Sequence, residues 1–211
     1  MVPSIRTAYN SNFTHAKYET FLQDLYSKHS GALDFRIAET PIFVDKAFKE
    51  KILSACESIV DVITGYNFKT LTSHAIPADV RVPNENDFSH FIAFDFGICE
   101  NEKGELEPQL IEMQGFPTLF AYEVYIDIVT RRHFEIPNNY SAYLSNLNED
   151  SYINLLRDII VANHQPENVI LLEIFPHQQK TRIDFYCTQD YLNIPVICLT
   201  ELIKEGKKLY Y

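Results

Sequence analysis

Two apolar segments joined by a polar turn constrain the fold of this chain more than any other feature. Residues 88–99 (FSHFIAFDFGIC) are rich in aromatic and β-branched side chains, and residues 109–113 (QLIEM) are mainly apolar again. The segment between them, ENEKGELEP, is polar and contains Gly104, which suits a reversal of the backbone. The sequence therefore predicts two antiparallel strands joined by a loop.

Four segments have the apolar spacing of amphipathic helices. They cover residues 14–29, the stretch between Asp45 and Gly65, residues 121–132 and residues 148–163. Thr14 can cap the first of them, and Gly65 can end the second. We expect residues 35–44 to be extended, and residues 77–88 to form an irregular loop because they contain two prolines and several turn formers.

The end of the chain has a different pattern. Residues 168–174 (NVILLEI) and 194–199 (IPVICL) are apolar runs, and the polar stretch at 177–191 between them is compatible with a helix. This βαβ order predicts a parallel pair of strands. The closing residues, ELIKEGKKLYY, are expected to form a short helix that enters a further, unfinished strand. The predicted class is α/β, with residues 1–147 forming one part and residues 148–211 an incomplete second part.

Charge and composition exclude several classes of function. The chain has 18 Lys and Arg against 29 Asp and Glu, so its net charge of -11 disfavours nucleic-acid and membrane-surface binding. No run approaches the roughly 18 apolar residues that cross a bilayer, and no secretory leader is recognised, which predicts a cytoplasmic protein. The four cysteines form no Cys-x-x-Cys pair, and neither glycine-rich phosphate-binding motif occurs.

Oxygen-bearing side chains of the predicted hairpin are candidate metal ligands. Asp95 lies on the first strand, and Glu112 and Gln114 share one face of the second because they are two residues apart. Two carboxylates and an amide oxygen suit Mg²⁺, with waters and substrate phosphates completing its shell. Spacing alone favours the simpler interpretation, a solvated face of an amphipathic hairpin. Asp95, however, lies within an apolar run, where a buried, unpaired carboxylate would be costly.

The same residues resemble a known family. Residues 91–130, and more weakly 148–211, are similar to the synthetase domain of glutathionylspermidine synthase and related circularly permuted ATP-grasp ligases. That family pairs Arg-Phe-Asp-Phe with a later Leu-Glu-x-Asn-Ala-Asp-Thr-Pro-Thr, and here the segments read AFDF (93–96) and IEMQGFPT (111–118). The resemblance implies that Asp95, Glu112 and Gln114 hold the magnesium ions of ATP. It also implies a partial ATP-grasp-like fold, with a Rossmann-like pre-ATP-grasp lobe at residues 148–211.

Two positions depart from the family pattern. Ala93 stands where the family has an arginine that would contact the transferred phosphate, and Gln114 stands in place of asparagine. Arg81 could replace the lost charge, although a solvated surface arginine is the favoured interpretation. Thr118 follows the metal-binding segment, in a turn that lies near substrate in the family, and is therefore a candidate substrate-binding residue.

The resemblance implies an ATP-dependent carboxylate–amine ligase, acting on small-molecule carboxylate and amine substrates through an acyl phosphate. In this family the phosphate-clamping lysines and loop follow the pre-ATP-grasp segment. We therefore expect this chain to represent the amino-terminal portion and to be inactive alone, which leaves its status as an enzyme open. The alternative is a non-catalytic pseudo-ligase or interaction domain, which could form a homodimer through an open sheet edge.

A basic cluster marks the end of the predicted helix at 121–132. Arg131, Arg132 and His133 follow one another there, where positive charges complement the helix dipole. We therefore favour solvated capping over anion binding for this cluster.

Overall fold

The computed structural model describes residues 2–86, 89–115 and 118–211, which form two compact units. Met1–Val2 with Val44–Pro117 make the first unit, and Pro3–Phe43 with Thr118–Tyr211 make the second. The boundary predicted from the sequence lies after residue 147, whereas the structure groups Pro3–Phe43 with Thr118–Tyr211 in one unit. The reason is that α5 (Phe120–His133) packs against both α2 (His15–Ser27) and α7 (Arg182–Leu192). The pairs 87–88 and 116–117, which include part of the family-like motif, lie outside the described residues.

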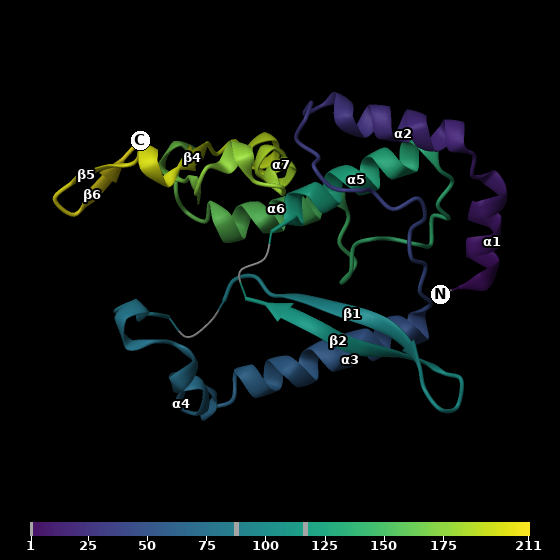
Figure 1. The fold of residues 1–211 in the computed structure, drawn as a ribbon, viewed down its shortest axis with the longest axis horizontal. Coiled ribbons are helices and arrows are strands. Elements are labelled where there is room, and N and C mark those ends of the chain that lie inside the picture. The colour runs from purple at the N-terminus through teal and green to yellow at the C-terminus, as the bar shows by residue number, and fades with distance from the viewer. Residues whose placement is uncertain (1, 87–88, 116–117) are drawn as a thin grey trace. The chain divides into compact units, whose positions relative to one another are not determined.

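The first unit contains the predicted hairpin and one long helix (Figure 1). Strands β1 (Ala93–Glu100) and β2 (Leu106–Gln114) pair in antiparallel fashion, which confirms the prediction. Helix α3 (Lys46–Ile63) begins after Asp45, whose carboxylate accepts a hydrogen bond from the Phe48 backbone N–H at 2.8 Å. The unit also contains the short helical elements α4 (Phe68–Thr72), η1 (Ser73–Ala75) and η2 (Ala78–Val80), the last within the predicted irregular loop.

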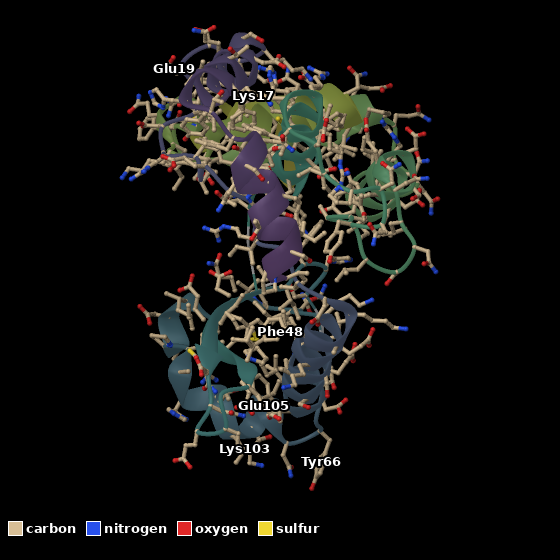
Figure 2. All side chains as sticks on the ribbon, turned by 90° about the vertical axis from the view of Figure 1, so that its right-hand side faces the viewer. Lys17, Glu19, Phe48, Tyr66, Lys103 and Glu105 are labelled. Carbon is tan, nitrogen blue, oxygen red and sulfur yellow. The ribbon has the colours of Figure 1, made fainter. Side chains whose placement is uncertain are left out.

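The described residues of the first unit include few buried apolar side chains. Helix α3 packs against β2, and Phe48 points from the helix toward the hairpin (Figure 2). Among the described residues of this unit, Phe48 is the one hydrophobic side chain that is buried, at 6% exposure. Leu71 and Ile111 are 70% and 71% exposed. A unit with so little buried apolar surface draws only modest stability from the hydrophobic effect.

The second unit contains the remaining elements. Its helices besides α2, α5 and α7 are α1 (Pro3–Asn12) and α6 (Glu149–Ile160), with 3-10 turns η3 (Pro166–Asn168), η4 (Pro176–Gln178) and η5 (Leu199–Glu201). Its strands are β3 (Leu171–Glu173), β4 (Val196–Cys198), β5 (Ile203–Glu205) and β6 (Lys208–Tyr210). The four predicted helices are confirmed as α2, α3, α5 and α6, and β3 pairs with β4 in parallel as the βαβ pattern predicts. The chain is therefore of the mixed α/β class.

Two segments differ from the sequence-based expectation. The closing residues form the antiparallel hairpin β5–β6 instead of a helix and an unfinished strand, because Gly206 takes the positive φ of 64° that a tight turn needs. Helix α1 was not predicted. Residues 35–44, which were expected to be extended, form neither a helix nor a paired strand, and Ile37 and Phe43 within them are buried. Among the helices of the described residues, none combines the length and apolar character needed to cross a membrane.

A buried carboxylate fixes the start of α5. Asp184, in the first turn of α7, is 6% exposed. Its Oδ1 accepts hydrogen bonds from the backbone N–H groups of Ala121 and Tyr122, both at 2.9 Å, and its Oδ2 accepts one from the Thr118 hydroxyl at 2.9 Å. These donors include first-turn N–H groups that have no partner inside the helix. Asp184 thus caps α5 from a neighbouring helix and compensates its own burial.

We predict that Asp184→Ala destabilises the second unit by about 2 to 3 kcal/mol, because it removes three hydrogen bonds and leaves buried donors without a partner. Thr118→Val removes only one of these bonds and should cost about 1 kcal/mol. Urea unfolding followed by far-UV circular dichroism measures both changes. Equal stability of Asp184→Ala and the unsubstituted chain would contradict this role.

A second carboxylate holds the end of α2 against α7. Asp190 Oδ2 lies 2.8 Å from Lys28 Nζ and 2.9 Å from His29 Nε2. Partial burial raises the pKa of Asp190, but the hydrogen bonds and positive charges of Lys28 and His29 outweigh that effect and leave the pKa below its ordinary value. The ion pair therefore stabilises the folded state while Asp190 is ionised.

This lowered pKa predicts a pH-dependent contribution to stability. A carboxyl group whose pKa is lower in the folded state stabilises the fold above its unfolded pKa, about 3.9, and loses that effect as the pH falls through the folded pKa. Asp190→Asn should therefore cost up to about 1 kcal/mol at pH 7. The difference from the unsubstituted chain should become smaller in the same urea titration as the pH falls below about 3.9. A difference that stays constant between pH 7 and pH 3 would refute the assignment.

Candidate metal centre

The strand register brings the predicted metal ligands together. Asp95 on β1 is the direct partner of Glu112 on β2, and Ala93 with Gln114 is the next pair on the same face, beyond Phe94 with Met113. Directly paired residues of antiparallel strands project from the same face of the sheet. The register shifts at this point, because Phe96 pairs with Leu110 and leaves Ile111 as an extra residue. The bulge thereby places both Glu112 and Gln114 on the Asp95 face.

The side chains of Glu112 and Gln114 are in contact. Gln114 Nε2 donates a hydrogen bond to Glu112 Oε1 at 2.6 Å. In this orientation the amide nitrogen faces the carboxylate, whereas a cation would bind the amide oxygen. For all three residues to share one ion, the amide group must turn about its terminal bond and release Glu112.

The three candidate ligands are all exposed to solvent. Asp95 escapes the cost of burial expected from its apolar surroundings, because its neighbours Phe94 and Phe96 project to the other, less exposed face of the hairpin. Within the described ranges, no three or more His, Cys, Asp or Glu side chains gather as a metal site. The hairpin thus offers two carboxylates and an amide. This set fits Mg²⁺ that retains waters and binds phosphate oxygens, but it does not form a closed protein cage.

Electrostatics also favours a cation at this face. Two carboxylates that lie directly opposite each other on neighbouring strands repel and destabilise the pairing. In the described part of the chain, no Lys, Arg or His forms an ion pair with Asp95 or Glu112. A bound divalent cation would turn this repulsion into attraction.

The other two candidate residues make local structural contacts. Arg81 donates from its guanidinium to the carbonyl oxygens of Ser73, at 2.9 Å, and Ile76, at 3.4 Å, and so ties η1 to the loop that follows. Thr118 belongs to the second unit, where its hydroxyl donates to Asp184. The hydrogen bonds found for Arg81 and Thr118 among the described residues therefore go to these partners and not to Asp95 or Glu112.

A further feature was missed by reasoning from the sequence. In the second unit a hollow of about 460 Å³ is lined by Lys17, Arg131, Arg132 and His133. The run of basic residues at the end of α5 was a visible signal. Lys17 was not, because it is more than a hundred positions away in the sequence.

Comparisons with known proteins add no relative: no family model matches the chain, and no curated protein or solved structure matches it either. The candidate centre therefore rests on the geometry of the hairpin and on the resemblance of its motifs.

We predict that Glu112→Gln stabilises the first unit by about 0.2 to 1 kcal/mol when divalent cations are removed, because it abolishes the cross-strand repulsion. Glu57→Gln removes the same charge from an exposed site on α3 instead of on a strand and serves as the control. Thermal unfolding in the presence of EDTA makes the comparison. A Glu112→Gln variant no more stable than Glu57→Gln would show that the repulsion is negligible.

Proposed function

We propose that this chain carries the magnesium-binding part of an ATP-dependent carboxylate–amine ligase that works in the cytoplasm. The supporting observation is the direct pairing of Asp95 with Glu112, next to Gln114, on an exposed hairpin face. These three positions match the metal-binding positions of the permuted ATP-grasp ligases that the motifs resemble. In this proposal residues 93–114 belong to an ATP-grasp-like region, and residues 148–211 form its Rossmann-like pre-ATP-grasp lobe.

Each hairpin residue has a defined task in this proposal. Asp95 and Glu112 provide the anionic oxygens that bind and orient Mg²⁺, and Gln114 adds a neutral oxygen after releasing Glu112. The bound ion would supply charge neutralisation at the β- and γ-phosphates of ATP. The exposure of the pair leaves room for waters and phosphate oxygens in the ion's shell.

Phosphate recognition in this proposal depends on the cation. Neither glycine-rich phosphate-binding motif occurs in the sequence, and the position of the family's phosphate-contacting arginine is occupied by Ala93. The small-molecule carboxylate and amine would be the other substrates, and transfer between them would need phosphate-clamping groups that these residues do not supply. We therefore expect magnesium-dependent nucleotide binding without ligase turnover from the 211 residues.

The test is nucleotide binding with and without magnesium. ATP with Mg²⁺ at a hundred times its dissociation constant should stabilise the chain by about 2.7 kcal/mol, whereas ATP with EDTA should not. Asp95→Asn and Glu112→Gln should each abolish the magnesium-dependent shift, while Glu57→Gln should keep it. Thermal unfolding and isothermal titration calorimetry provide the measurements. The proposal would be overturned if Mg²⁺ and ATP did not stabilise the unsubstituted chain, or if both variants kept the full magnesium-dependent stabilisation.

A second candidate is a non-catalytic pseudo-ligase or interaction domain. The observation that favours it is the two-stranded sheet itself, since β1 and β2 each have an outer edge with no further strand among the described residues. Such edges pair readily with another strand, including that of a second copy. A homodimer that persists in the Asp95→Asn, Glu112→Gln double variant and ignores Mg²⁺ in sedimentation equilibrium would favour this candidate over the ligase.

A further inference from the structure

A hollow in the second unit combines side chains from three helices. It has a volume of about 460 Å³ and lies where α1, the start of α2 and the end of α5 meet. Lys17 lines it from α2, and Arg131, Arg132 and His133 line it from the last turn of α5. Asn12 and Asn138 add amide groups. The volume falls in the range of pockets that hold small molecules.

One cation of the hollow is held rigidly. The Nε of Arg131 lies 3.1 and 3.0 Å from the two carboxylate oxygens of Asp127, and its terminal nitrogen donates to the Tyr140 carbonyl at 2.8 Å. These contacts fix the plane of the guanidinium. A ligand that used its remaining donors would not have to order this side chain on binding.

Two other cationic side chains still have hydrogen-bond donors available for a ligand. Arg132 is 58% exposed, and its contact with Asp24 Oδ2 is long, at 3.6 Å, because His133 Nε2 holds the same oxygen at 2.9 Å. Lys17 is exposed and directs one hydrogen bond, of 2.9 Å, to the carbonyl of Asn12. An ammonium group has three donors and a guanidinium has five, so both side chains can reach a further acceptor.

The position of Lys17 indicates that capping of α5 does not account for the whole cluster of cations in the hollow. Arg131, Arg132 and His133 complement the carbonyl end of α5, as the sequence predicts. Lys17, by contrast, lies in the first turn of α2, near Glu19 (Figure 2), where the helix dipole opposes a positive charge. An anion in the hollow would offset that unfavourable placement and would also meet the positive end of α2.

Two aromatic side chains also line the hollow. Tyr9 and Phe134 both line it, both are buried, and their ring centroids lie 5.2 Å apart. The Tyr9 hydroxyl donates to the Glu39 carbonyl at 3.1 Å, so the ring is fixed in place. A ligand with an apolar or aromatic body could pack against these rings while its anionic group faces the cations.

We propose that this hollow binds a small phosphomonoester with an aromatic or apolar body. Its lining brings together Lys17, Arg131, Arg132 and the carboxylate of Glu135, within a chain whose net charge is -11; Asp127 and Asp24, which pair with the two arginines, are not among the lining residues. A phosphate group carries about 1.5 to 2 negative charges at pH 7 and three acceptor oxygens, which match these cations better than one carboxylate would. The proposal is independent of the hairpin and of the ligase function.

The experiment titrates the full chain with phenyl phosphate, inorganic phosphate and benzoate at constant ionic strength, by isothermal titration calorimetry. We expect saturable binding of phenyl phosphate, weaker binding of inorganic phosphate, which lacks the ring, and weaker binding of benzoate, which lacks the second charge. Added salt should weaken all three, because the attraction is electrostatic. Equal affinity for benzoate and phenyl phosphate would overturn the assignment of phosphate.

Substitutions locate the site. Arg132→Gln and Lys17→Gln should each weaken phenyl phosphate binding by about tenfold, as expected for loss of one charged hydrogen bond. Arg132→Lys should retain part of the affinity. Lys180→Gln removes an equal charge from an exposed residue outside the hollow and should leave binding unchanged. No binding by the unsubstituted chain, or the same loss from Lys180→Gln as from Arg132→Gln, would refute the proposal.

Discussion

Helix α5 is fixed at both ends by carboxylates that other helices supply. At its start, Asp184 of α7 accepts hydrogen bonds from two backbone N–H groups and from Thr118. At its end, Asp24 of α2 contacts His133 and, at longer range, Arg132. The helix therefore cannot slide or rotate without exposing a buried carboxylate or breaking an ion pair. Because the hollow is built on the last turn of α5, its shape depends on this fixation.

In the first unit the corresponding constraint is one extra residue in a strand. If β1 and β2 kept the register of their turn end, Asp95 would face Ile111, and Glu112 would project to the opposite, apolar face beside Phe94. The bulge at Ile111 reverses that outcome, because a shift of one residue exchanges the two faces of a strand. The candidate metal centre thus exists only because the strand pairing is irregular.

The elements predicted correctly were those set by local interactions. Thr14, Asp45 and Asn148 cap helices through backbone groups three residues away, so sequence spacing is enough to find them. The parallel pair of β3 and β4 followed from two apolar runs and the helix between them. The cap by Asp184 and the meeting of Lys17 with Arg132 join residues distant in the chain, and no local pattern encodes them. The sequence identifies the three candidate metal ligands, while the bulge that places Glu112 and Gln114 on the same face as Asp95 is seen only in the structure. Their role remains a proposal.

The discontinuity of the second unit has a consequence for biosynthesis. Its first segment, Pro3–Phe43, contributes α1 and α2, and α5, the helix on which α2 packs, begins only at Phe120. During translation α2 therefore leaves the ribosome well before the helix that it packs on, with Tyr18, Phe21 and Leu25 exposed until α5 arrives. If residues 44–117 become compact first, they shorten the effective loop between α2 and α5 and lower the entropy lost on closing it. The inserted unit would then act as a folding aid for the polypeptide that surrounds it.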